Sequence, residues 1–259
     1  MIHRGDAVCV LTLNRPEKRN SLSPDLLIDL YQVIEGLSKD DSVRTLILRG
    51  AGEQAFSAGY DVGSLPTKLR PDIQEKLRRQ NPLELATESL ASFPYPVIAM
   101  LNGSAYGAGC ELAICCDIRI AADDVRMGIP AAKIGLVYPL KGLHRFIQVL
   151  GVRRAKELLF TGRAYEGSQL KEMGLVDHLV PRPDLEPFTF RMAEEMAHNA
   201  PLALKGTKRI LNLLANAASL GEDERQEAEA IIADTFNSED LREGQRAFLE
   251  KREPRFKGK

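Results

Sequence analysis

Residues 102–112 read Asn-Gly-Ser-Ala-Tyr-Gly-Ala-Gly-Cys-Glu-Leu, a glycine-rich turn that runs into an apolar segment. The β-rich run Pro96–Leu101 precedes this turn and predicts a buried strand, and Cys110–Cys116 predicts a short buried helix. Glycines let a backbone approach a ligand closely, and the first amides of a helix have no acceptor within the helix. The stretch therefore predicts either a backbone site for a partly negative group or a tight strand-to-helix turn with no further role.

A single carboxylate, Glu111, lies in the first turn of this apolar helix. Burying a charged group among apolar neighbours is costly unless the group is paired or used in chemistry. Glu111 follows Ala108 by three residues, so its carboxyl can stand beside the site that the Ala108 amide faces. The alternative is a carboxylate that is simply favoured by the helix N-terminus. Nucleotide sites are not indicated, because both the Lys-Ser/Thr of a phosphate loop and the full G-x-G-x-x-G spacing are missing.

Strand and helix patterns alternate on both sides of this stretch, which favours a layered α/β fold. Further strands are predicted at Ala7–Leu13, Thr45–Leu48 and Ile118–Ala122, and Ser23 is predicted to cap a helix that begins at Pro24 and ends near Ser38. A loop is predicted over Gly50–Gly63. After about Gly142 the chain is mostly helical, with predicted helices at Arg153–Phe160, Gly167–Met173, Leu185–Ala197, Leu202–Ala217, Glu222–Phe236 and Glu239–Lys251.

The composition is that of an ordinary globular protein: 259 residues, 44% hydrophobic, 27% charged, and a formal net charge of -1. This balance gives no general attraction to nucleic acid. No apolar run approaches the roughly 18 residues of a membrane span, so we expect a cytoplasmic protein without an anchor. The cysteines and histidines lack metal-site or disulfide spacing, so we expect buried, reduced thiols and no metal: Cys9, Cys110, Cys115, Cys116, His3, His144, His178 and His198.

The segment Leu65–Asn81 carries five basic residues with little apolar patterning. We interpret it as an exposed, mobile insertion near the site that the preceding loop builds. The alternative is a charged face that is only solvated.

Two longer motifs resemble the signatures of the crotonase (enoyl-CoA hydratase/isomerase) superfamily. They are Phe56-Ser-Ala-Gly-Tyr-Asp61 and, about forty residues later, the stretch from Pro96 through Ala113, followed by Cys116-Asp-Ile-Arg-Ile-Ala-Ala. Asn14-Arg-Pro-Glu-Lys-Arg-Asn20 and Ala247-Phe-Leu-Glu-Lys-Arg match as well, so the resemblance covers essentially the whole chain.

The resemblance implies a spiral core of repeated ββα units over residues 1–195 and a helical region over residues 196–259 that assembles trimers or hexamers. It implies a coenzyme A thioester as substrate, whose oxygen is held by the amides of Tyr60 and Ala108. Such an oxyanion hole would be the largest catalytic contribution, since each donor is typically worth about 3 kcal/mol. The residues it places around coenzyme A are Lys18, Arg19, Ala58, Tyr60, Asp61, Val62, Gly107 and, from the basic C-terminus, Lys251, for which a solvated tail is the alternative.

The chain departs from the hydratase pattern at one position. Hydratases of the family place two glutamates around the acyl chain; Glu111 matches the first, but the second position is Ala131. Alanine cannot transfer a proton, so efficient hydration by two carboxylates, or isomerisation that uses the second glutamate, is not expected.

A closer resemblance is to the methylmalonyl-CoA decarboxylase branch of the superfamily, through Gly135-Leu-Val-Tyr-Pro139 and Gly142-Leu-His144. Tyr138 matches the active-site tyrosine of that branch, although an ordinary half-buried tyrosine is the alternative. The branch has histidine at the position of Tyr60, which is a departure. Loss of CO2 generates an enolate without a base, which makes sense of Ala131.

The sequence thus predicts a lyase, of hydratase or decarboxylase type, in which Tyr60 and Ala108 hold the oxyanion and Glu111 and Tyr138 handle protons. An enoyl-CoA isomerase is one alternative. A protein that binds acyl-CoA without catalysis is another, and turnover of CoA thioesters distinguishes it.

Overall fold

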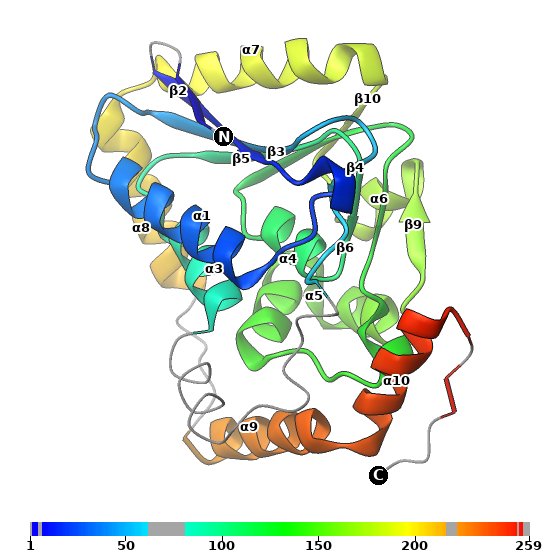
Figure 1. Ribbon diagram of the computed structural model, residues 1–259. Helices are drawn as coiled ribbons and strands as arrows, with labels where there is room; N and C mark the ends of the chain where they lie inside the picture. The colour runs from blue at the N-terminus through cyan, green and yellow to red at the C-terminus, as the bar shows by residue number, and fades with distance from the viewer. Residues whose placement is uncertain (1, 5–6, 62–80, 216–221, 253, 256–259) are drawn as a thin grey trace.

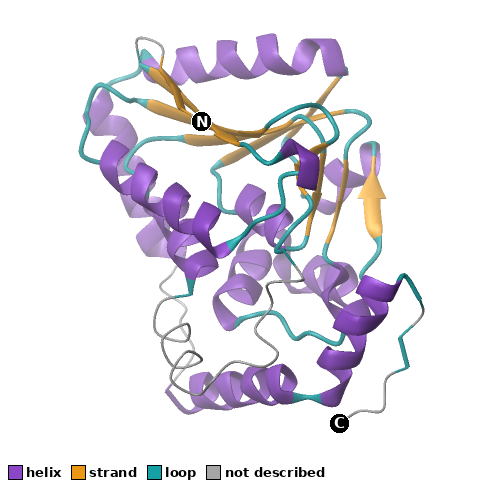
Figure 2. Ribbon diagram, in the orientation of Figure 1, coloured by secondary structure: helices purple, strands orange, loops and turns teal. Residues whose placement is uncertain are grey.

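The computed structural model describes residues 2–4, 7–61, 81–215, 222–252 and 254–255. A six-stranded sheet runs in the order β1-β2-β3-β5-β7-β10, and a second, four-stranded sheet in the order β4-β6-β8-β9 (Figures 1 and 2). All neighbours are parallel except β1 with β2 and β8 with β9. The strands are β1 (Ile2–Arg4), β2 (Val8–Leu13), β3 (Thr45–Gly50), β4 (Ala55–Ser57), β5 (Val97–Leu101), β6 (Ser104–Tyr106), β7 (Ile118–Ala122), β8 (Arg126–Gly128), β9 (Ala164–Glu166) and β10 (His178–Val180).

Successive turns of the chain give one strand to each sheet and then a helix, as in β5–β6–α4. This arrangement confirms the predicted α/β spiral of ββα units. The central strands are continuous apolar runs because helices cover both faces of the large sheet, and every residue of β5 is buried. Helix α7 (Leu185–Ala197) covers one face, and α1 (Pro24–Leu37), α3 (Pro82–Ser92) and α4 (Ala108–Ile114) lie on the other (Figure 1).

Local capping explains where several helices begin. Ser23 Oγ accepts a hydrogen bond from the Leu26 amide at 3.3 Å, as predicted for the start of α1. Asn81 caps α3 in the same way, accepting from the Leu83 amide at 3.0 Å. The remaining helices are α5 (Leu140–Thr161), α6 (Ser168–Met173), α8 (Pro201–Ala215), α9 (Glu222–Asn237) and α10 (Glu239–Glu250), and the short 3-10 helices are η1 (Pro16–Lys18), η3 (Pro130–Ile134) and η4 (Arg182–Asp184).

The structure corrects several boundaries. Helix α5 begins at Leu140 and not at Arg153. Gly151 (φ 71°, ψ 156°) breaks its helical geometry and separates two helical parts, and the predicted helix corresponds to the second part. The predicted loop Gly50–Gly63 contains β4, and the predicted turn Asn102–Gly109 contains β6. Helix α4 begins at Ala108, two residues before the predicted start. Most of the predicted insertion Leu65–Asn81 lies outside the described residues.

The four cysteines are free and buried, as the sequence indicated. No helix within the described ranges is long and apolar enough to cross a membrane.

Candidate active site

The loop that carries Tyr60 is held by the Asn14–Asn20 motif. Asn20 is fully buried and left-handed (φ 54°), and its Nδ2 donates to the carbonyls of Ala51 and Ala55 at 3.0 and 2.8 Å. The Ser57 hydroxyl donates to the Asn20 carbonyl at 2.8 Å and accepts from the Gly59 amide at 3.2 Å. These bonds fix the backbone of the loop immediately before Tyr60.

Two glycines bring this loop against the start of α4. A side chain on Gly59 would meet the Tyr106 carbonyl at 2.5 Å and the Ala108 amide nitrogen at 3.5 Å. A side chain on Gly109 would meet the Ser57 Cβ at 2.6 Å. The backbone at Gly59–Tyr60 therefore lies beside the Ala108 amide, which is the first of the helix and has no acceptor within it.

Both segments line one large cavity of about 2210 Å³. Gly107 opens α4 with φ 53° and ψ -123°, a conformation that favours glycine, and no described residue beyond its chain neighbours lies within 4 Å of where its side chain would be. The predicted residues Ala58, Tyr60, Gly107, Ala108 and Tyr138 all belong to the lining.

Glu111 lies behind this cavity, and it is not among the described residues that line it. It is 3% exposed, and its Oε1 accepts from Arg145 Nη1 at 3.2 Å. Its Oε2 is buried without a geometrically satisfactory hydrogen bond among the described residues. Burial raises the pKa of Glu111 to about 7, against the opposing influence of Arg145 and of the nearby Tyr138 hydroxyl.

Tyr138 lines the cavity and lies close to Glu111. It is 6% exposed, and its ring packs edge-on against Phe146 with 5.6 Å between centroids. Burial and the neighbouring Glu111 charge raise the pKa of its hydroxyl well above the usual value. The arrangement thus presents a neutral phenol to the cavity, with a carboxyl group of near-neutral pKa behind it.

Ala131, on η3, is buried and lines the same cavity. Its methyl group occupies the wall where the sequence comparison expected a second glutamate. The described pocket therefore combines an acidic group set behind Tyr138 with an apolar wall at Ala131.

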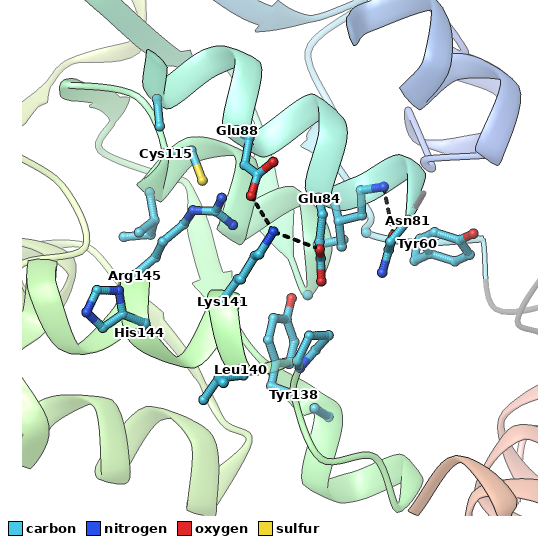
Figure 3. A pocket seen from close by; sticks show the side chains of 18 of the residues that line it. Tyr60, Asn81, Glu84, Glu88, Cys115, Tyr138, Leu140, Lys141, His144 and Arg145 are labelled. Carbon is cyan, nitrogen blue, oxygen red and sulfur yellow. Dashed lines mark hydrogen bonds and ion pairs between the residues drawn. The ribbon is translucent and has the colours of Figure 1, made fainter. Parts of the chain in front are cut away.

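The structure adds residues that the sequence did not suggest. Lys141 and Arg145 extend from the start of α5 toward α3, beside the predicted Tyr138 (Figure 3). Lys141 Nζ contacts Glu88 Oε1 at 2.5 Å and Glu84 Oε2 at 3.3 Å. Because the helix was predicted to begin only at Arg153, helical spacing was not used to find Lys141 and Arg145.

Of the other residues predicted to contact coenzyme A, some adjoin the cavity and others lie outside its described lining. Arg19 is exposed, and its carbonyl accepts from the Ala58 amide at 2.9 Å, so it adjoins the cavity wall. Asp61 forms an ion pair with Arg15, with 3.8 Å between Asp61 Oδ2 and Arg15 Nη2. Lys18 and Lys251 are exposed and outside the described lining. Val62 lies outside the described residues.

Comparisons with known proteins bear on the fold and the family of the chain. The family model described as "Enoyl-CoA hydratase/isomerase" matches residues 3–259. The chain belongs to this family. It is 34% identical to methylmalonyl-CoA decarboxylase of Escherichia coli, over 97% of this chain and 95% of the relative, and 33% identical to 2,3-dehydroadipyl-CoA hydratase of the same organism, over 100% and 98%. A solved structure of methylmalonyl-CoA decarboxylase in complex with 2-nitronate-propionyl-CoA superposes with a TM-score of 0.92 at 33% identity, covering 100% of this chain and 98% of that one.

Membership of the family makes this protein an acyl-CoA-processing enzyme of the crotonase superfamily. The relatives include hydratases and a decarboxylase, in line with the predicted lyase class.

Proposed function

We propose that the enzyme decarboxylates a malonyl-type coenzyme A thioester. The observation that carries this proposal is that the cavity presents the Tyr138 phenol and the Ala131 methyl group, while Glu111, the one carboxylate predicted to be catalytic, is not among the described residues of the lining. Loss of CO2 leaves the bonding pair on the thioester as an enolate, so no base is needed to remove a proton. A malonyl-type substrate is in line with the solved structure of methylmalonyl-CoA decarboxylase that superposes on the chain.

In this proposal the amides of Tyr60 and Ala108 donate to the thioester oxygen, and their positions at the fixed loop and at the start of α4 support the role. Negative charge develops on that oxygen as the bond between Cα and the carboxylate carbon breaks. Preorganised donors of this kind are each worth about 3 kcal/mol. CO2 leaves, and Cα then takes a proton from the Tyr138 hydroxyl.

Hydration of an enoyl thioester is the second candidate. The raised pKa of Glu111, about 7, suits a group that gives and takes protons near neutral pH, and one relative is a hydratase. A single carboxylate must then activate water and protonate Cα. Isomerisation that needs a second glutamate is disfavoured by Ala131.

The test is incubation with malonyl-CoA, methylmalonyl-CoA and crotonyl-CoA, following CO2 release and enoyl absorbance together. We expect CO2 release from a malonyl-type thioester with little crotonyl-CoA hydration. Hydration without CO2 release would overturn the proposal, and binding without any turnover would favour the non-catalytic alternative.

The remaining features stay predictions. We propose that Lys18, Arg19 and Lys251 contact the phosphates of coenzyme A, which is supported by their exposed positive charge. We further propose that the enzyme is cytoplasmic. We also propose that it forms a trimer or a dimer of trimers, which is supported by the exposed apolar side chains of α8.

A further inference from the structure

Arg145 forms a largely buried ion pair at the back of the cavity. Its side chain is 14% exposed and that of Glu111 is 4% exposed, whereas the neighbouring Lys141 is 51% exposed in its pairs with Glu84 and Glu88. Withdrawing two charges from water is costly, and a buried pair contributes little net stability. A role in the chemistry explains this pair better than stability does.

The first turns of α5 hold Glu111 and Tyr138 together. A side chain on Gly142 would meet the Tyr138 Cδ1 at 2.8 Å and Glu111 Oε1 at 3.0 Å, so the helix backbone rests on both groups. Arg145, one turn later, engages Oε1. The second oxygen of Glu111, Oε2, is left buried without a well-formed hydrogen bond to the described residues.

We propose that Arg145 is a positioning residue that fixes Glu111 through one carboxyl oxygen and leaves the carboxyl group to supply the proton that Tyr138 passes to the enolate. This inference rests on the proposed decarboxylation. In it, Glu111 gives its proton to Tyr138 and not directly to the substrate.

The proton transfers balance. The enolate Cα takes the proton of the Tyr138 hydroxyl, which forms the C–H bond and leaves a phenolate. The phenolate takes the proton of the neutral Glu111 carboxyl. Glu111 is then a carboxylate that is held by the Arg145 cation, and a proton from solvent restores it before the next turnover.

The pH dependence follows from the groups that face Glu111. They are Arg145 on α5, Tyr138 before it, Glu84 on α3 and Cys110 and Cys115 on α4. Burial raises the pKa of Glu111 to about 7, and Arg145 is the strongest opposing influence. Because the neutral carboxyl supplies the proton, activity should fall as pH rises through this value. Removing Arg145 raises the pKa further and moves this fall to higher pH.

The experiment compares Arg145→Met and Arg145→Lys in the full-length enzyme with a malonyl-type CoA thioester. For Arg145→Met we expect kcat to fall by roughly tenfold to a hundredfold with KM changed by less than about threefold, since an imperfectly set proton donor loses part of its usual contribution. The fall in activity at alkaline pH (the alkaline limb) should move up by about one pH unit. Arg145→Lys should partly restore both kcat and the position of this limb. The matched control is Arg126→Met on β8, which removes an exposed ion pair with Glu166 on β9 and should leave kcat and the pH dependence unchanged.

A second measurement does not depend on turnover: the infrared carbonyl band of protonated Glu111, identified by its loss in Glu111→Gln, should persist to higher pH in Arg145→Met. If the wild type releases CO2 but the limb and the band do not move, Arg145 has no positioning role and the decarboxylase proposal stands. A large change in KM with an unmoved limb would make Arg145 a substrate contact and overturn the inference. A wild type that releases no CO2 overturns the proposed function and, with it, the proton step.

Discussion

Ala108 offers the reaction only its backbone amide, so a substitution that removes the amide proton tests the proposed oxyanion hole directly. Ala108→Pro should lower turnover by roughly two to three orders of magnitude, because one donor of the pair is lost. Proline is tolerated at the first position of a helix, so α4 should still form. The measurement is kcat with the confirmed CoA thioester.

The chain provides a matched control for this change. Gly167 precedes α6 with φ 54° and ψ -136°, nearly the geometry of Gly107 before α4, and Ser168 is the first residue of that helix. Ser168→Pro should therefore carry a similar folding cost and keep full turnover. A folded Ala108→Pro protein with wild-type turnover would remove the amide from the mechanism.

Tyr138 and Glu111 can be ranked by substitution. If decarboxylation dominates, Tyr138→Phe should depress kcat more than Glu111→Gln, because only the phenol lines the cavity. If the enzyme is a hydratase, the order should reverse. Both variants are measured on the same confirmed substrate, and small, equal losses would exclude both proton-handling roles.

These residues differ in how far the sequence revealed them. Glu111 was recognisable because a carboxylate among apolar neighbours is costly without a use. Its partner Arg145 lies 34 positions later and meets it only through tertiary packing. The position of Tyr138 in front of Glu111 likewise depends on the close approach of Gly142, which no local pattern encodes.

The 3-10 helix η3 forms the part of the cavity wall that carries Ala131, where the resemblance to hydratases led us to expect a glutamate. Ala131→Glu should raise crotonyl-CoA hydration, since a positioned acid or base contributes about a hundredfold to ten-thousandfold. A new carboxylate on this buried wall must be desolvated and its pKa should rise, so we expect the low end of that range or less.

The hydration rates of Ala131→Glu and the parent are compared, with thioester affinity measured separately. No gain with intact binding would mean that position 131 does not face the reacting carbons or that Tyr138 fills the space. The double change with Tyr138→Ala distinguishes these two cases, because only the second is rescued by it.

Periodicity predicted the long elements well: α1 and its Ser23 cap, β2, β3, β5 and β7 lie close to their predicted ranges. The three-residue strands of the second sheet, β4, β6, β8 and β9, were missed because so short a run has no measurable alternation. Their pairing is long-range, as when Ala55 aligns with Ser104. The second sheet was therefore expected only through the family resemblance.

Helix α8 departs from the usual arrangement, in which a helix turns its apolar side toward the core of the molecule. Polar side chains tie it to the core: Lys205 pairs with Asp41, Lys208 with Asp117 at 2.6 Å, and Asn212 donates to the Ala91 carbonyl at 3.0 Å. Most of its large apolar side chains are exposed instead, and Leu211 and Leu214 are 60% and 67% exposed. A row of exposed apolar residues on one helix is typical of a protein interface.

We therefore expect this face of α8 to be buried between copies of the chain, and Leu211→Glu combined with Leu214→Glu to dissociate the assembly. Two carboxylates in an apolar interface must be desolvated without partners, which costs several kcal/mol. Light scattering after size-exclusion chromatography should give a multiple of 28.7 kDa for the wild type and the single-chain mass for the variant. Gln169→Glu, at an exposed polar position of α6, adds a carboxylate elsewhere and should leave the mass unchanged. A monomeric wild type, or a double variant that keeps the wild-type mass, would contradict the role of α8, and the exposed leucines would then require a different partner.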